Sequence, residues 1–362
     1  MISLLDVKRQ TASIRGEIDA AIARVLDHAQ FILGPEVREL EEQAAAYCGT
    51  KFAVACASGS DAVMLPLMAL GLKPGDAVLT VPFTFFATAG SIRHLGLTPR
   101  FTDIDPSTFN MKLENVPEDV KAIMPVHLFG QCADMDAINE IAARHGIPVI
   151  EDAAQAIGSE FRGRRAGSLG WCGAFSFFPS KNLGACGDAG MITTNDEELA
   201  AKLRMLRVHG SRVRYYHEMV GVNSRLDTMQ AAILLVKLRY LDEWTERRRG
   251  HARLFRELLG GLDLVLPFEE SCGRHIYNQF TIRVRERDAV KARLAALGVG
   301  SEIYYPVPLH LQGCFAELGY QVGDFPVSER VAGEVLSLPI EEGLSDGDVA
   351  EVAAQVKEAL GG

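Results

Sequence analysis

A single lysine stands out because of its neighbours. Lys181 lies in residues 174–190, AFSFFPSKNLGACGDAG, with phenylalanines before it and glycines after it. Lysine normally keeps its ammonium in water and is almost never fully buried unless it is paired. In a desolvated pocket its pKa falls and the neutral amine becomes a nucleophile, as Schiff-base chemistry requires. The alternative is a surface lysine in a loop, and this segment alone leaves both interpretations open.

A carboxylate follows an apolar segment earlier in the chain. Asp152 comes directly after residues 149–151, in the segment EDAAQAIG. A carboxylate at a buried strand end must be paired or hydrogen-bonded. It is either the N-cap of a helix or the partner of a protonated heterocyclic nitrogen. A nucleophilic lysine, such a carboxylate and a phosphate-binding helix start form the set that pyridoxal phosphate enzymes use.

Three further positions could hold such a cofactor. A strand expected over residues 52–56 leads into the segment ASGSD, which contains Ser60, and then into a helix. This geometry presents backbone N–H groups and the helix dipole to a phosphate, although the segment could be only an N-cap. Ser176 could also bind phosphate, and Phe85 could stack on a pyridine ring. Alternatively, Ser176 is an ordinary serine within a strand and Phe85 is an ordinary core residue.

The elements that position these residues follow from the hydrophobic pattern. Short apolar segments alternate with helices of about ten or more residues, which predicts βαβ units and a mainly parallel sheet in an α/β fold. Ligands bind at the carboxyl ends of such strands, where Ser60, Phe85, Asp152 and Gln155 fall. We expect strands over residues 52–56, 77–81, 99–103, 122–126 and 148–151, and helices over 13–29, from Pro35, over 62–70, up to 95, over 134–145 and over 197–208.

The chain changes character after residue 195. Residues 209–217 lack periodicity and predict a loop near a dimer interface, and residues 227–258 predict a long helical region. We expect residues 1–240 to form a large α/β domain with an N-terminal helical arm, and residues 241–362 a small α+β domain. The elements expected in the small domain are strands over 275–284 and 299–305 and helices over 288–297, 328–336 and 346–360.

The composition excludes several classes of protein. The net charge of −10 is spread along the chain, which argues against a nucleic-acid partner. No run of about 18 apolar residues exists and the N-terminus has no signal-peptide core, so we expect a cytoplasmic protein that does not span a membrane. The seven cysteines form no CxxC pair and the histidines have no metal-ligand spacing, which predicts reduced thiols and no metal.

Nearly the whole chain resembles sugar aminotransferases of the DegT/StrS group, which are fold-type I pyridoxal phosphate enzymes with a large cofactor-binding domain and a small C-terminal domain. The nearest similarity is to enzymes that aminate C3 of a UDP-linked 3-keto-N-acetylhexosaminuronic acid, through GQCADMDAI, FFPSK and VGVNSRLDTMQAAIL. The segments that carry the resemblance, within residues 32–312, are ILGPEVRELE, ASGSDAVMLPLMALGLKPGD, PFTFFATAGSI, FTDIDPSTFN, PVHLFGQCADM, IEDAAQAIGS, FSFFPSKNLGACGDAGMITTND, GVNSRLDTMQAAILLVKL and YYPVPLHLQ.

The resemblance implies a role for each matching residue. Lys181 would carry the cofactor as a Schiff base and transfer protons, and Asp152 would hold the pyridinium proton. Gln155 would contact the ring hydroxyl and Phe85 would stack on the ring. The remaining cofactor contacts would be to the phosphate, from Gly59, Ser60 and Ser176 of one subunit and Asn223 of its neighbour, which makes a homodimer the catalytic unit.

The substrate side is less closely matched. Arg225 and Tyr305 match positions near the sugar nucleotide, and Tyr304 and His310 are further candidates for substrate contact. Relatives often have His-Tyr-Pro where this chain has Tyr304-Tyr305-Pro306. Tyrosine has a different reach from histidine and carries no cation at neutral pH, so the identity of the sugar stays open.

The resemblance implies transfer of an amino group from L-glutamate to a keto sugar nucleotide, for surface polysaccharide or related sugar biosynthesis. C4 amination of a dTDP-, GDP- or UDP-4-keto-6-deoxyhexose and amination of a cyclitol ketone are alternatives. A sugar dehydratase that uses the same cofactor is a further alternative, but in the dehydratases of this group a histidine replaces the lysine that corresponds to Lys181. A non-catalytic regulatory protein on this scaffold would be expected to lose Lys181 or Asp152.

Overall fold

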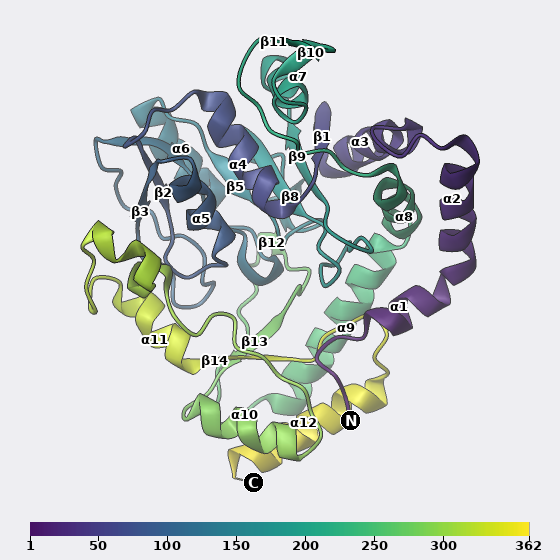
Figure 1. Cartoon of the computed structure of the whole chain (residues 1–362). Coiled ribbons are helices and arrows are strands. Elements are labelled where there is room, and N and C mark those ends of the chain that lie inside the picture. Colours follow the sequence, from purple (N-terminus) through teal and green to yellow (C-terminus); the bar gives the residue numbers. More distant parts are fainter. Residues whose placement is uncertain (362) are drawn as a thin grey trace.

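The computed structural model describes residues 1–361, and a central β-sheet organises its first half (Figure 1). Two hydrogen-bonded groups of strands, ordered β1-β9-β8-β5 and β3-β2-β4, are joined by parallel bridges from Ile123 to Val149 and from Val126 to Asp152. The strands are β1 (Phe52–Cys56), β2 (Ala77–Thr80), β3 (Thr98–Phe101), β4 (Val120–Ile123), β5 (Ile150–Asp152), β8 (Cys172–Ser176) and β9 (Gly190–Thr194).

The expected mainly parallel sheet is confirmed. Strand β9 runs antiparallel to both of its neighbours, β1 and β8. The pairs β5–β8, β2–β3 and β2–β4 are parallel. Because β5 and β8 are parallel neighbours, their carboxyl ends lie at the same edge of the sheet, and these ends carry Asp152 and the segment that leads to Lys181.

Helices cover both faces of this sheet. Alternate residues of β1 point to opposite sides, so that Ala53 packs with α3, α6 and α8, whereas Val54 packs with α4, α5 and α7. Burial on both faces explains why β2 and β8 have no polar side chain before their last residue. The helices of this part are α1 (Val7–Ser13), α2 (Arg15–His28), α3 (Pro35–Cys48), α4 (Gly59–Leu70), α5 (Ala87–His94), α6 (Met135–His145), α7 (Glu197–Leu206) and α8 (Thr228–Leu238).

The C-terminal part has its own apolar cluster. Helices α9, α10 and α12 pack around the antiparallel pair β13–β14. The N-terminus joins this cluster, since Ile2 forms a bridge with Val299 and the Asp6 N–H donates to Glu341. Residues 315–325 pack instead against Phe101. The elements are α9 (Leu241–Leu259), β13 (Phe280–Arg283), α10 (Arg287–Ala296), η2 (Leu309–Leu311), η3 (Gly313–Leu318), α11 (Pro326–Glu334), β14 (Val335–Leu338) and α12 (Asp346–Leu360). The division into residues 1–240 and 241–362 remains our proposal.

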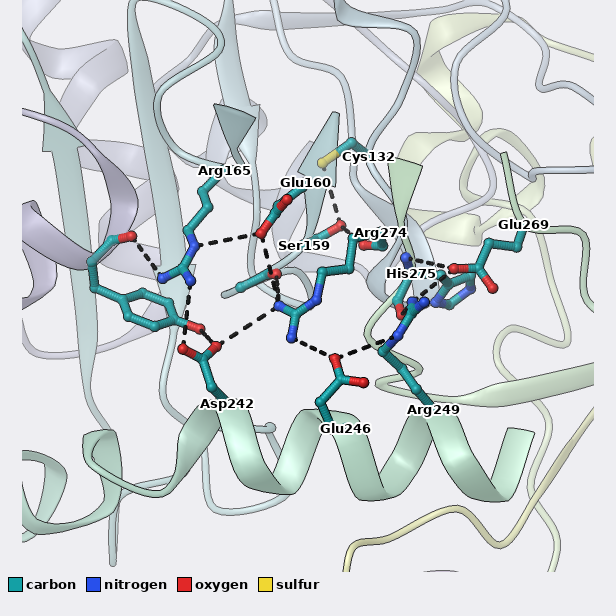
Figure 2. A network of polar contacts seen from close by, with 12 residues as sticks. Cys132, Ser159, Glu160, Arg165, Asp242, Glu246, Arg249, Glu269, Arg274 and His275 are labelled. Atoms are coloured by element: carbon teal, nitrogen blue, oxygen red, sulfur yellow. Dashed lines mark hydrogen bonds and ion pairs between the residues drawn. The ribbon is translucent and has the colours of Figure 1, made fainter. Parts of the chain in front are cut away.

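A network of polar contacts joins the two parts (Figure 2). Strand β12 (Gly273–Arg274) adds to the hairpin of β6 (Glu160–Phe161) and β7 (Arg164–Arg165). The Arg274 guanidinium lies between the carboxylates of two α9 residues, 2.8 Å from Glu246 and 3.8 Å from Asp242. Arg165 contacts Asp242 from the other side, at 3.5 Å. Helix α9 is thus fixed against the edge of the first part.

Three sequence expectations are wrong. The expected loop at 209–217 contains a short hairpin, β10 (Ser211–Val213) and β11 (Tyr216–His217). The helical region at 227–258 breaks between Leu238 and Leu241, because α8 packs against the sheet whereas α9 packs in the C-terminal cluster. Residues 299–305 make only single bridges to Ile2 and Ser337 rather than a strand. Helix α1 had no counterpart among the expected elements.

Candidate active site

Lys181 lies in a tight loop after β8. Its backbone N–H donates to the Phe178 carbonyl at 2.9 Å, and Ala185 N–H donates to the Phe177 carbonyl at 2.8 Å, which closes the loop around the lysine. Burial lowers the pKa of Lys181 to about 8, and the Asp152 carboxylate acts in the opposite direction. A lysine with this lowered pKa is partly neutral near neutral pH, which suits it to act as a nucleophile.

Asp152 is the last residue of β5 and is buried. Burial raises its pKa, while hydrogen bonds and the Lys181 charge oppose the rise. One carboxylate oxygen accepts from the Thr88 hydroxyl at 2.7 Å and the other from the Ala154 N–H at 3.2 Å. The residues that follow form turns, so the helix N-cap interpretation is wrong. The carboxylate is held in place beside Lys181 and can partner a protonated ring nitrogen.

Thr88 is a site residue that the sequence analysis missed. It lies in the first turn of α5, is buried, and its hydroxyl is 3.1 Å from that of Thr84. Asp152 and Thr88 are 64 positions apart. The only local signal is a pair of threonines at helical spacing, which is too common to indicate a function.

Glu151, beside Asp152 on β5, points to the opposite face and is fully buried. Its carboxylate accepts the backbone N–H groups of Gly167, Leu169 and Gly170, each at 2.7 Å, and lies 3.0 Å from His127 Nε2. His127 Nδ1 accepts from the Ala133 N–H, so Nε2 carries the proton that faces Glu151. His127 is thus a fully buried core residue.

An anion cradle forms where α4 meets the end of β8. Helix α4 starts at Gly59, and Ser58 caps it by accepting from the Asp61 N–H at 3.1 Å. A Cβ atom at Gly59 would lie 2.5 Å from Ser176 Cβ, so only glycine lets the helix come this close. The first N–H groups of a helix have no intrahelical acceptor and attract anions. Gly59, the exposed Ser60 and Ser176 thus meet at one place that suits a phosphate.

Ser224 is a second residue that the sequence analysis missed. Its hydroxyl donates to Asp61 at 2.8 Å and accepts from the Ala57 N–H at 3.2 Å, which braces the start of α4. The neighbouring Asn223 is exposed and bridges Val208. Its expected contact with the cofactor of another subunit stays a prediction.

Gln155 and the aromatic residues Tyr305 and Phe85 form a further part of the candidate site. The Gln155 amide accepts from the Phe129 N–H at 2.7 Å and donates to the Tyr305 hydroxyl at 3.0 Å. The Tyr305 ring lies 6.0 Å from that of Phe85, which is 57% exposed. An exposed phenylalanine is not a core residue, so Phe85 is free to stack on a planar ring. Burial raises the pKa of Tyr305, which keeps its phenol protonated.

The remaining candidate substrate contacts are spread out. Arg225 and Tyr304 are half-buried, and burial raises the pKa of Tyr304. His310 is buried, with Nε2 3.1 Å from Glu329 and its ring 4.8 Å from that of Phe325. Its neighbours thus belong to an aromatic cluster rather than to the group around Lys181. No group of acidic, histidine or cysteine residues between positions 1 and 361 has a metal-binding arrangement.

These residues fit pyridoxal phosphate. The lysine amine suits its aldehyde, the Asp152 carboxylate its ring nitrogen, the exposed Phe85 face its ring, and the cradle at Gly59 and Ser176 its phosphate. The fit depends on observed features, above all the space left by the missing side chain at Gly59. A lysine-anchored cofactor with a carboxylate opposite defines a class of group-transfer enzyme.

Comparison with known proteins identifies the family. Residues 12–357 match the DegT/DnrJ/EryC1/StrS aminotransferase family. A pleiotropic regulatory protein of Geobacillus stearothermophilus is 52% identical, over 94% of this chain and 93% of its own. The UDP-2-acetamido-2-deoxy-3-oxo-D-glucuronate aminotransferase of Pseudomonas aeruginosa is 45% identical, over 98% of this chain and 99% of its own. The crystal structure of DesV from S. venezuelae superposes with a TM-score of 0.96 at 41% identity, covering 100% of this chain and 99% of DesV.

The chain therefore belongs to the DegT/DnrJ/EryC1/StrS aminotransferase family. It is a pyridoxal phosphate-dependent aminotransferase, as the resemblance implied. Among the described residues, none of the helices is both long and apolar enough to cross a bilayer.

Proposed function

We propose that this enzyme transfers an amino group from L-glutamate to a keto sugar nucleotide, with the C3 ketone of a UDP-2-acetamido-3-keto-hexuronic acid as the preferred acceptor. The observation that carries the proposal is the Lys181 amine, which has a lowered pKa and lies near the buried Asp152 carboxylate. The choice of acceptor is supported by the name of the Pseudomonas aeruginosa relative, which matches almost the full length of the chain.

Each protein group has a definable task. Pyridoxal phosphate, when bound, supplies an aldehyde and a ring that withdraws electrons. Lys181 binds that aldehyde, and once displaced by the amino donor it carries a proton away from the donor Cα. A positioned general base of this kind contributes typically about 10²–10⁴-fold. Asp152, oriented by Thr88, keeps a proton on the ring nitrogen.

The second half-reaction uses the same groups in reverse. Lys181 returns a proton to the carbon of the former ketone, while Gln155 and Tyr305 hold the surrounding wall through their 3.0 Å hydrogen bond. Gly59 and Ser176 anchor the phosphate throughout, so that both substrates meet the same fixed geometry. Arg225 and Tyr304 are the side chains we assign to the sugar nucleotide.

The proposal includes a homodimer in which Asn223 of one subunit contacts the phosphate held by the other. The exposure of Asn223 next to Ser224, which braces the start of α4, supports this assignment. We also propose that the enzyme works in the cytoplasm. Each of the seven cysteines is a free thiol, which is typical of a reducing compartment.

Other acceptors remain second candidates. A 4-keto-6-deoxyhexose nucleotide or a cyclitol ketone would use the same lysine and carboxylate. The dehydratase is disfavoured because Lys181 is present. The similarity to a protein named as a regulator does not make this chain non-catalytic, since both Lys181 and Asp152 are in place.

The experiment is a two-stage assay. The purified protein is saturated with pyridoxal phosphate, converted with L-glutamate, desalted, and offered UDP-, dTDP- and GDP-linked 3-keto and 4-keto sugars. The expected result is that the absorbance of the lysine-bound cofactor returns fastest with the UDP-linked 3-keto acid, with an amino sugar detected by mass. Faster return with a 4-keto sugar contradicts the proposed acceptor, and no return with any ketone contradicts the function. Lys181→Ala is the inactive control.

A further inference from the structure

A second lysine lies beneath the loop of Lys181. Lys237 is fully buried near the end of α8. Its ammonium donates to the Gly184 carbonyl at 2.7 Å and to the Gln10 side-chain oxygen at 3.1 Å. Gly184 comes three residues after Lys181. A buried lysine is costly unless it is hydrogen-bonded or paired, so this position calls for an explanation.

The loop between Lys181 and β9 is pressed against its own backbone. A Cβ atom at Gly184 would lie 2.5 Å from the Pro179 carbonyl oxygen. Ala185 N–H already donates to the Phe177 carbonyl, so the Gly184 carbonyl points away from the loop and toward α8. Between positions 1 and 361, the Lys237 ammonium is the only hydrogen-bond donor to that carbonyl.

Helix α8 holds the loop at two points. Gln230 lies about two turns before Lys237, on the same side of the helix. Its amide accepts from the Cys186 N–H at 2.8 Å and donates to the Cys186 carbonyl at 3.3 Å. Gln230 and Lys237 together fix residues 184–186 against a helix that packs on the central sheet.

The ammonium is itself held by a buried chain of polar groups. The Gln10 amide donates to Glu342 at 2.7 Å, and the Glu342 carboxylate pairs with Arg248 at 3.0 Å. Arg248 also donates to the Ile340 carbonyl at 2.7 Å. The chain runs from the lysine loop through α1 to the C-terminal part, and all of its side chains are buried. The Lys237 stem therefore has little freedom to move.

We propose that Lys237 is a positioning residue that holds the loop of Lys181 so that its amine meets the cofactor aldehyde in the reactive geometry. This inference rests on the proposed attachment of pyridoxal phosphate to Lys181. Removal of the ammonium leaves two buried acceptors, on Gly184 and Gln10, without their donor. The loop then loses one of its two anchors on α8, and a displaced amine reacts more slowly.

The test separates attachment from cofactor binding. Apoprotein of Lys237→Met is mixed with pyridoxal phosphate, and the amount linked irreversibly to Lys181 after borohydride reduction is followed by mass against time. The affinity for pyridoxamine phosphate, which needs no lysine link, is measured in parallel. We expect attachment to slow by about tenfold or more, because a small misplacement is enough for such a loss. We expect pyridoxamine phosphate affinity to change less than about twofold, since the cradle is untouched.

Lys202→Met is the matched control. The Lys202 ammonium also donates to a backbone carbonyl, that of Ala69 at 2.5 Å, but at the far end of α4. This variant is expected to attach the cofactor at the wild-type rate. If Lys237→Met yields no folded protein, Lys237→Gln replaces it; its stem is one atom shorter, and it too is expected to attach slowly.

Two results would overturn the inference. One is a wild-type attachment rate in the Lys237 variant. The other is an equal loss of attachment and of pyridoxamine phosphate affinity, because that pattern means general destabilisation rather than positioning. A wild-type protein that attaches no pyridoxal phosphate at Lys181 would instead contradict the proposed function, so the two failures are distinguishable.

Discussion

Lys181 and Asp152 each favour the charged form of the other, yet burial outweighs this attraction at both residues. The pKa of Lys181 falls from 10.5 to about 8 despite the carboxylate beside it, and the pKa of Asp152 rises despite the ammonium. At neutral pH, roughly one amine in ten is then neutral, compared with fewer than about one in a thousand for an ordinary lysine. The nucleophile is available without a separate base.

A pH dependence follows from this shift. The neutral amine attacks the aldehyde, so the rate of pyridoxal phosphate attachment to the apoprotein should rise with pH and level off above about 8. Protonation lowers the rate as pH falls through that value. In Asp152→Asn the charge that favours the ammonium is gone, so the midpoint should move to lower pH. Stopped-flow absorbance measures both curves. A wild-type rate that still rises between pH 9 and 10 would show an ordinary lysine.

Local patterns were sufficient to select the candidate site residues that lie at strand ends or in marked turns. Lys181, Asp152, Gln155 and the exposed Phe85 belong to this group, because a parallel sheet brings its carboxyl ends together. Thr88, Ser224 and Lys237 were missed because the contacts that matter here are distant in sequence. Thr88 is 64 positions from Asp152, Ser224 is 163 from Asp61, and Lys237 is 53 from Gly184.

At the scale of elements, strand β5 illustrates how neighbouring residues serve two faces. Asp152 lies on the side of Lys181, while Glu151 turns into the core and accepts three backbone N–H groups that fix the segment 167–170. His127, four residues after the end of β4, completes this arrangement. The carboxylate of Asp152, to which we assign a catalytic role, thus lies next to a buried carboxylate that fixes the surrounding backbone.

Glu151→Gln should therefore destabilise the protein strongly. The new amide NH₂ would face N–H donors from Gly167, Leu169 or Gly170, which leaves buried donors unsatisfied. The expected loss in the free energy of unfolding is about 3 kcal/mol, measured by urea denaturation. Glu160→Gln is the control, since Glu160 is partly exposed and its arginine partners are 3.7 Å and 4.0 Å away. Its loss should stay below about 1 kcal/mol. Equal losses in the two variants would contradict this account.

Element boundaries were predictable where a cap or breaker marks them. Strand β1 matches its expected range, and Pro35 opens α3 as expected. The break between α8 and α9 carries neither glycine nor proline. It arises because the apolar residues of α8 and those of α9 pack into different hydrophobic clusters. The spacing of apolar residues along a short segment does not reveal this difference. The hairpin at 211–217 is exposed, so it lacks the apolar alternation that signals a strand.

At the scale of the whole molecule, contacts distant in sequence tie the site to both parts of the chain. The network around Arg274 fixes α9 to the β6–β7 hairpin (Figure 2). The chain from Gln10 to Arg248 joins the N-terminal helix to the C-terminal part. The sequence predicted a mainly parallel sheet but neither of these networks, because polar pairs between distant segments have no periodic pattern.

The proposed sharing of sites between subunits makes a prediction for mixed dimers. Lys181→Ala and Asn223→Ala proteins are denatured together, refolded with cofactor and assayed. If Asn223 serves the partner's site, each mixed dimer contains one intact site, and the mixture should recover up to about a quarter of wild-type activity. If Asn223 serves its own subunit, mixing restores nothing beyond the residual activity of Asn223→Ala, and the shared site is contradicted.

The most direct test of the central claim is chemical. The native protein is incubated with pyridoxal phosphate, reduced with borohydride and digested, and the modified peptide is located by mass. We predict one dominant phosphopyridoxyl adduct, on Lys181, that is absent from Lys181→Ala. An adduct spread over surface lysines, or a dominant one elsewhere in the chain, would contradict the assignment of Lys181 as the cofactor-binding amine.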